Sequence, residues 1–297
     1  MIQNLNFYDI YGYLIPGLTL SILIWLPLGL IEKRWPTADW TSALVAVVIG
    51  YVVGHVLQVL ARNALPSKTM HGRYPSDALL DKEQKSFSQV LKARLRVRIE
   101  KLSGIDVRTD LESKDITEEV RTQRREAFLF CRDTLLTAKI ISYAEQMQGM
   151  YTLTNGLTVA FSLGAAQNLG WALSGIQRST LEIVASLFVG LGLAGAILVA
   201  VLGSRKNASS SEAARMTRAR WTVGFAMAAL LGSGYILGVG RVSNLDQRGR
   251  LAVVALTCVF SGLTCFASYK YFTKVYAETI YRAFNLYEKP DKPSEAK

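Results

Sequence analysis

Six apolar runs and one long charged stretch alternate along this chain. The apolar runs cover residues 7–31, 41–61, 150–168, 181–203, 221–240 and 251–269. A helix needs about 20 mostly apolar residues to cross the hydrocarbon core of a bilayer. The pattern therefore predicts a polytopic membrane protein with about six helical spans.

The first run begins with the sequence FYDIYGYLIPG, whose aromatic residues suit the interface between membrane and water. Pro16 lies about two turns into this helix and removes a backbone hydrogen bond. The carbonyl oxygen that it frees must be satisfied by a neighbour. We expect either an elbow at the interface or a gating hinge at this proline. No basic region precedes the run, which favours a retained span over a cleaved signal peptide.

Small and polar residues mark the second run. Gly50 and Gly54 have GxxxG spacing, which permits the backbone of another helix to approach closely. A stripe of polar residues recurs at helical spacing along one face: Tyr51, His55, Gln58 and Arg62. Because His and Gln are costly in a bilayer, this stripe should face either a bundle interior or a watery path. Interhelical hydrogen bonding and a pore or ligand path both remain open.

The third run, residues 150–168, is the least apolar of the six. Its polar residues lie roughly along one helical face: Thr152, Asn155, Thr158 and Ser162. This face is the best candidate for lining a pore, although a polar seam within a helix bundle explains the pattern nearly as well. The predicted pore-lining residues of the two runs are Tyr51, His55, Gln58, Asn155 and Thr158.

The charged stretch separates the second and third runs. It holds 16 Lys and Arg against 13 Asp and Glu between Asn63 and Met150. A lipid core does not accept that density of charge, so residues 63–149 should form a water-facing domain. Residues 86–103 fit both strand alternation and a helical stripe. Their length and the position of Gly104 favour a helix that ends at this glycine.

A second helix of this domain should begin at Asp115, with Glu118 as its capping-box partner. We expect it to run toward Met147 and straight into the third span. Beyond the sixth run, apolar residues continue at helical spacing: Phe272, Val275, Tyr276, Ile280, Ala283, Phe284 and Tyr287. The last helix should therefore project from the membrane and pack on the charged domain.

Positive charge is densest on the predicted helix 86–103. From Lys82 to Lys101 there are seven bases against two acids. The predicted ligand-binding residues are Lys92, Arg94, Arg96, Arg98 and Lys101. A solvated helix face is the simpler interpretation, and a surface for a nucleotide or oligonucleotide is the alternative.

Composition and charge agree with an all-α membrane bundle that carries one water-facing insert. The 297 residues are 50% hydrophobic and 19% charged, with a mean hydropathy of +0.21. The predicted domains are spans 1 and 2 in 1–62, the helical basic domain in 63–149, spans 3 to 6 in 150–269, and a C-terminal helix and tail in 270–297. Placing the insert, the linker 204–220 and the C-terminus on one side puts 28 of the 34 Lys and Arg there. The positive-inside rule then places both termini in the cytoplasm.

Patterns that support catalysis are weak. The predicted spans offer only His55 and Glu182 as titratable groups for proton transfer, and no HExxH motif is present. The cysteines Cys131, Cys258 and Cys265 lack CxxC spacing and are expected to be buried structural thiols. We expect no enzyme activity, no cofactor and no metal site.

The N-terminal FYDIYGYLIPG, together with SGID at residues 103–106 after a basic helix, resembles a group of bacterial membrane proteins. These are small multi-pass proteins with an aromatic-Asp-Gly-Tyr-Leu-Ile-Pro-Gly signature. Some proteins of this kind are encoded in anti-phage defence loci, where the membrane partner permeabilises the inner membrane. The resemblance implies a location in the bacterial inner membrane and carries over no catalytic or ligand residue.

Two functions follow as hypotheses. The first is an oligomeric, channel-like effector of about four copies, joined through small-residue faces and gated by an anionic nucleotide or oligonucleotide on the basic domain. The second is a non-conducting membrane anchor or scaffold that recruits a soluble partner. The first predicts a continuous polar path, and the second predicts polar side chains bonded within a closed bundle.

Overall fold

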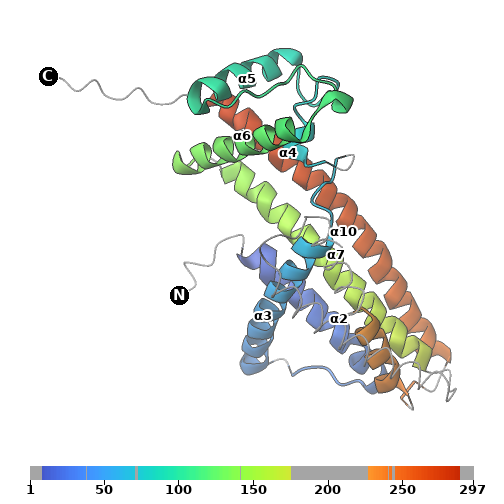
Figure 1. Ribbon diagram of the computed structural model, residues 1–297. Coiled ribbons are helices and arrows are strands. Elements are labelled where there is room, and N and C mark those ends of the chain that lie inside the picture. The colour runs from blue at the N-terminus through green and yellow to red at the C-terminus, as the bar shows by residue number, and fades with distance from the viewer. Residues whose placement is uncertain are drawn as a thin grey trace, which may run out of the picture. The chain divides into compact units, whose positions relative to one another are not determined.

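The computed structural model describes residues 9–37, 39–70, 73–140, 142–174, 227–239, 241–242 and 245–287. Every regular element in these ranges is a helix (Figure 1). The chain divides into two compact units. We call Met1–Pro66 with Gly149–Tyr269 the apolar unit, and Ser67–Gln148 with Lys270–Lys297 the charged unit.

The apolar unit starts with a short π-helix, η2 (Ile10–Leu14), that continues into α2 (Ile15–Glu32). Pro16 lies in the first turn of α2, but η2 precedes it without a break, so the missing N–H leaves the Gly12 carbonyl without its usual helical partner. Helix α3 (Trp40–Ala64) begins at Asp39, whose carboxylate accepts the Ser42 N–H at 2.6 Å.

Glycines let α2 and α3 touch at the backbone. A Cβ atom on Gly17 would lie 1.7 Å from the Gly50 carbonyl oxygen, and one on Gly54 would lie 1.9 Å from the Tyr13 carbonyl oxygen. The predicted close approach at the GxxxG pair is therefore confirmed, and the chain's own helices supply the partner. That face is occupied within one chain, so association of copies needs another surface.

Helix α7 (Ser142–Ser174) contains the predicted third span, 150–168. Of the described residues 149–174, Leu169 alone is exposed. A helix that is buried on all sides is the centre of its unit. Gly170 and Gly234 extend the close packing, since a Cβ on Gly170 would lie 2.1 Å from the Leu231 carbonyl oxygen of the helix Met227–Gly238.

Three helices of the described ranges are long and apolar enough to cross a membrane: Ile10–Glu32, Trp40–Ala64 and Leu245–Leu286. Helix α7 does not meet that description, because Thr, Asn, Gln and Ser lower its hydropathy. The predicted span 181–203, the linker 204–220 and the start of the fifth predicted span lie outside the described residues. The prediction of six spans therefore stays a prediction.

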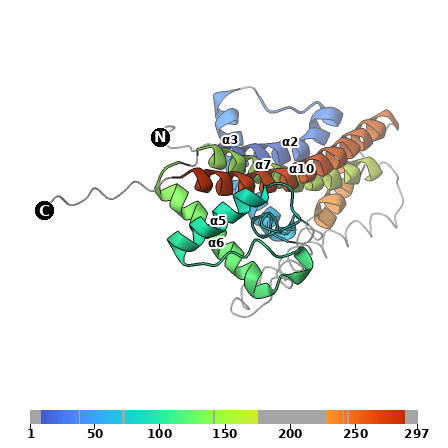
Figure 2. The same ribbon diagram turned by 90° about the horizontal axis from the view of Figure 1, so that it is seen from above.

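The charged unit has its own apolar core, built from α5 (Gln89–Ser103), α6 (Glu118–Thr137) and the C-terminal part of α10 (Leu245–Leu286). The short helices α4 (Pro75–Ala78) and η3 (Ser113–Asp115) complete it. Tyr281 and Phe284 of α10 are fully buried against residues such as Leu95 and Leu135. Figure 2 shows the last turns of α10 beside α5. The C-terminal part of the apolar stripe thus packs on the charged unit as predicted, through Tyr276, Ile280, Ala283, Phe284 and Tyr287.

Local signals explain where these helices end. The Ser88 hydroxyl caps the first turn of α5, and Gly104 ends it in the left-handed region at φ 74°. The helix prediction for residues 86–103 is confirmed. The predicted start of the next helix at Asp115 is wrong, because Thr117 is the residue that caps α6.

The predicted continuous helix from this domain into the third span is also wrong. Helix α6 ends at Thr137, Lys139 adopts a left-handed φ of 56°, and α7 begins anew at Ser142. A lysine in that region breaks the helical hydrogen-bond ladder.

Candidate functional site

The five predicted ligand-binding bases of α5 do not form one free surface. Lys92 is fully buried, which corrects the expectation that it lies on an exposed row. Its ammonium donates to the backbone carbonyl oxygens of Asp81, Lys82 and Gln84 and so closes the turn before α5. Burial lowers the pKa of Lys92, and the nearby Asp81 carboxylate opposes this effect.

Two further bases of α5 are held by contacts within the charged unit. Arg96 forms ion pairs with Asp106 at 3.0 Å and Asp110 at 3.6 Å. Arg98 donates to the Asn285 carbonyl oxygen at 2.6 Å and lies over the Phe284 ring. The Arg94 and Lys101 side chains are exposed and make no hydrogen bond or ion pair within the described ranges. A five-base ligand surface is therefore reduced to two free side chains.

Gln58 is the polar centre of the apolar unit. Its buried amide nitrogen donates to the Gly12 carbonyl oxygen at 2.6 Å and to the Thr152 carbonyl oxygen at 2.8 Å. Gly12 is the residue four positions before Pro16, so its carbonyl lacks the usual helical partner. The side chain thus satisfies the oxygen that the proline frees and joins three helices.

The other predicted pore-lining residues of α7 also face inward. Asn155 and Thr158 are buried, and the Thr158 hydroxyl donates to the Thr154 carbonyl oxygen at 2.7 Å. The Asn155 Oδ1 atom is buried and accepts no hydrogen bond in the part of the chain that is described. Of the two interpretations of this face, the polar seam within a bundle matches its burial.

Tyr51 and His55 behave differently, since both are exposed on α3. The His55 ring stacks on Tyr13 with ring centroids 4.0 Å apart and meets Tyr51 edge to face at 4.5 Å. One imidazole nitrogen, Nδ1, lies 2.9 Å from the Tyr51 carbonyl oxygen. We call Tyr13, Tyr51 and His55 the aromatic cluster. The predicted polar stripe is therefore split, with Gln58 inside the chain and the aromatic cluster outside.

The charged unit contains a buried ion-pair cluster that sequence reasoning missed. Arg73 donates four hydrogen bonds of 2.6 to 3.0 Å to the carboxylates of Asp77 and Asp81. Arg124 adds a 2.7 Å bond to Asp81 and also donates to the Arg108 carbonyl oxygen. Burial opposes the charge of Arg73, but its bonds to both aspartates outweigh this and raise its pKa.

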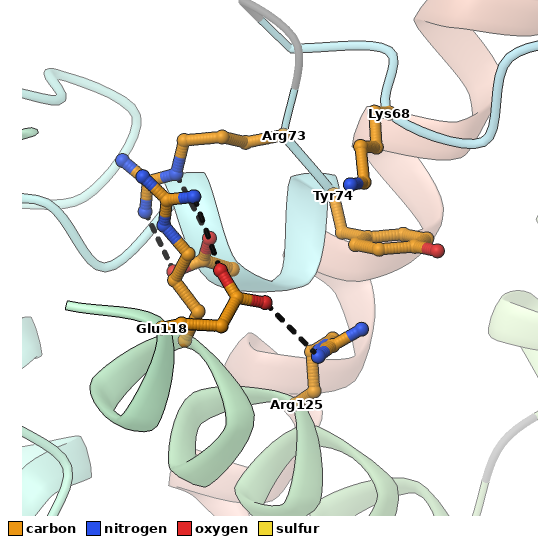
Figure 3. A pocket seen from close by; sticks show the side chains of 7 residues that line it. Lys68, Arg73, Tyr74, Glu118 and Arg125 are labelled. Carbon is orange, nitrogen blue, oxygen red and sulfur yellow. Dashed lines mark hydrogen bonds and ion pairs between the residues drawn. The ribbon is translucent and has the colours of Figure 1, made fainter. Parts of the chain in front are cut away.

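A cationic pocket adjoins this cluster. Its lining residues come from 68–77 and the first turns of α6: Lys68, Arg73, Tyr74, Asp77, Glu118, Arg121 and Arg125. Figure 3 shows the Tyr74 ring between the Lys68 ammonium and the Arg125 guanidinium, which lie 5.8 and 5.3 Å from its centroid. The open space is about 20 Å³, enough for one water-sized group.

Glu118 supplies the negative charge of the cationic pocket. Its carboxylate lies 3.3 Å from Arg121 and 3.7 Å from Arg125. The lining side chains include four bases and two acids, and Arg73 is already engaged by aspartates. The sequence offered one signal for the buried ion-pair cluster beside this pocket, which is the spacing of Arg73, Asp77 and Asp81 at i, i+4 and i+8.

The cysteines of the described ranges are free thiols. Cys131 and Cys258 are buried, as expected, whereas Cys265 is only half-buried. Those ranges contain no group of three His, Cys, Asp or Glu side chains placed to hold a metal ion. The chain matches no protein-family model, and no curated protein or solved structure is significantly similar to it.

Proposed function

We propose that this protein is a non-conducting membrane anchor that holds its charged unit at the membrane surface to receive a soluble partner or ligand. Three apolar helices of sufficient length support the membrane part of this proposal. The charged unit has a separate core and a dense set of ionic groups, which suit it to water.

The bonding of Gln58 is the observation that carries the proposal. A water path through one chain needs polar side chains that are free to exchange partners with water or ions. The Gln58 amide instead donates to two backbone carbonyls, and the Asn155 and Thr158 side chains of α7 are buried. In a bilayer such groups serve as interhelical bonds that join a bundle.

Ion flux across liposomes tests this proposal. The purified full-length chain is reconstituted with a potassium gradient, and a potential-sensitive dye reports flux with and without added nucleotides and oligonucleotides. We expect no flux above protein-free liposomes, while a pore-forming peptide serves as the positive control. Flux that requires this protein, under either condition, would overturn the anchor function.

The aromatic cluster favours a second candidate, the oligomeric channel-like effector. An exposed imidazole on an apolar helix is costly in lipid and is normally turned toward protein or water. Several copies, about four, that bring His55 together would place it around a shared path. His55→Leu should then abolish flux of the wild-type chain, whereas unchanged flux would remove His55 from any pore.

The cellular setting belongs to the same proposal. The resemblance at FYDIYGYLIPG supports the bacterial inner membrane and a role in anti-phage defence, and the 28 to 6 division of basic residues supports cytoplasmic termini. Plaque counts on cells with and without the full locus test the defence role. Equal counts across a panel of phages would contradict it.

A further inference from the structure

We propose that the cationic pocket binds a phosphate group, and that Glu118 occupies the site as an internal anion until the phosphate displaces it. This inference rests on the proposed function, because it names the ligand that the charged unit receives at the membrane surface. The anion site that we propose differs from the one predicted from the sequence, which lay on the exposed face of α5.

The charge balance of the pocket favours an added anion. Arg73 and Asp77 neutralise each other within the buried cluster, where their shortest contact is 2.6 Å. Of the other lining side chains, Arg121 and Arg125 face the single carboxylate of Glu118. Two guanidinium groups facing one carboxylate leave a local excess of positive charge, which a phosphate dianion matches better.

The two arginines present their donors to one point. Arg121 and Arg125 are one helical turn apart on α6, so their side chains share a face. Both already reach the Glu118 carboxylate. The Nε atom of Arg121 is buried and donates no hydrogen bond within the described residues. Planar guanidinium groups bind phosphate oxygens in pairs, which suits Arg121 and Arg125 to a phosphate.

Glu118 is placed to leave the pocket. Its side chain is 72% exposed, whereas Arg121 and Arg125 are 38% and 36% exposed. Rotation into water therefore costs this carboxylate little solvation. The open space of about 20 Å³ is too small for a phosphate beside Glu118, so binding requires the exchange.

A phosphate in this position has two sources, a soluble phosphate compound or a phospholipid headgroup. Only three residues separate Ala64, the end of the apolar helix α3, from Lys68. Their backbones are therefore at most about 14 Å apart along the chain. This link keeps a headgroup within reach without excluding a soluble ligand.

Binding by the full-length protein tests the inference. The soluble probe is inorganic pyrophosphate, measured by calorimetry in a neutral detergent. The lipid probe is flotation with phosphatidylcholine vesicles that contain or lack phosphatidylglycerol. We expect Arg121→Gln with Arg125→Gln to weaken whichever probe binds by about tenfold or more, since each bond to a charged group is lost.

A charge-matched control distinguishes binding in the cationic pocket from general attraction of the probe to positive charge. Arg94→Gln with Lys101→Gln removes the same charge from the exposed face of α5 and should leave the affinity unchanged. Equal weakening by both double variants would overturn the pocket. Glu118→Gln removes the internal competitor and should raise the affinity, and an unchanged or lower affinity would overturn the exchange.

Protection of Cys131 in the core reports whether each variant is folded. If the double arginine variant loses this protection, the single variants Arg125→Gln and Glu118→Gln are used instead. Arg125→Gln must then lower the affinity for the probe, and Glu118→Gln must raise it. No binding of either probe by the wild type overturns the inference. The liposome flux experiment tests the anchor function separately. If the protein bound phosphate and also conducted ions, the anchor function would be refuted and the phosphate site would stand.

Discussion

Removal of Arg73 should cost the charged unit more stability than removal of any other member of the ion-pair cluster. Its guanidinium bonds both carboxylates, and Asp77 and Asp81 are only 2% and 5% exposed. Without Arg73, the Asp77 carboxylate keeps only the 3.4 Å contact from Arg124 among the described residues. Arg73→Met keeps much of the side-chain length and leaves that carboxylate almost uncompensated.

The expected loss follows from the buried position. Breaking a buried ion pair by removing one partner costs about 3–5 kcal/mol, because the other charge is stranded away from water. Arg124→Met should cost less, since Arg73 still bonds both aspartates. A loss of about 3 kcal/mol raises the open fraction of the unit by roughly a hundredfold.

Cys131 provides the assay. It is fully buried in the core of the charged unit, and burial raises the pKa of its thiol far above the usual value. In a background with Cys258 and Cys265 changed to Ala, thiol labelling follows the open fraction when closing is faster than labelling. We expect Arg73→Met to be labelled roughly a hundredfold faster than its parent.

Two comparisons make this result decisive. Arg94→Gln, at an exposed side chain with no hydrogen bond or ion pair in the described ranges, should stay within about twofold of the parent. Labelling of Arg73→Met within the same limit would refute the reasoning. Adding Asp77→Asn to Arg73→Met removes the stranded charge and should slow the labelling again. If it did not, lost packing and not charge would explain the loss.

Three further predictions concern the apolar unit. Gln58→Leu leaves the Gly12 carbonyl without its donor, at about 1–3 kcal/mol, and should lower the thermal midpoint in detergent; an unchanged midpoint would contradict this role of Gln58. Gly54→Ala would place Cβ 1.9 Å from the Tyr13 carbonyl oxygen and should reduce the yield of monodisperse protein, while Gly249→Ala, with nothing within 4 Å, should not. Similar yields of these two variants would contradict the packing. Fluorescent protein fused to either terminus should fluoresce inside cells, and periplasmic phosphatase activity of such a fusion would refute the orientation.

Much of the helical framework can be predicted from the sequence, because its signals are local. Apolar length predicts α2, α3 and the first part of α10, and Gly104 predicts the end of α5. Pro16 requires a carbonyl to find another partner, whatever the surrounding fold. Each of these depends on residues within a few turns of one another.

Only the tertiary structure decided which groups the buried polar and charged side chains bond to. Helical spacing groups residues on a face, but it does not say which face turns inward, so Lys92 was expected outside and is buried. Gln58 meets Gly12 and Thr152 from helices far apart in sequence. Arg73 and Arg124 likewise meet at two shared aspartates. A buried charge or amide must find a partner, and only the folded chain determines which distant group lies within hydrogen-bonding distance.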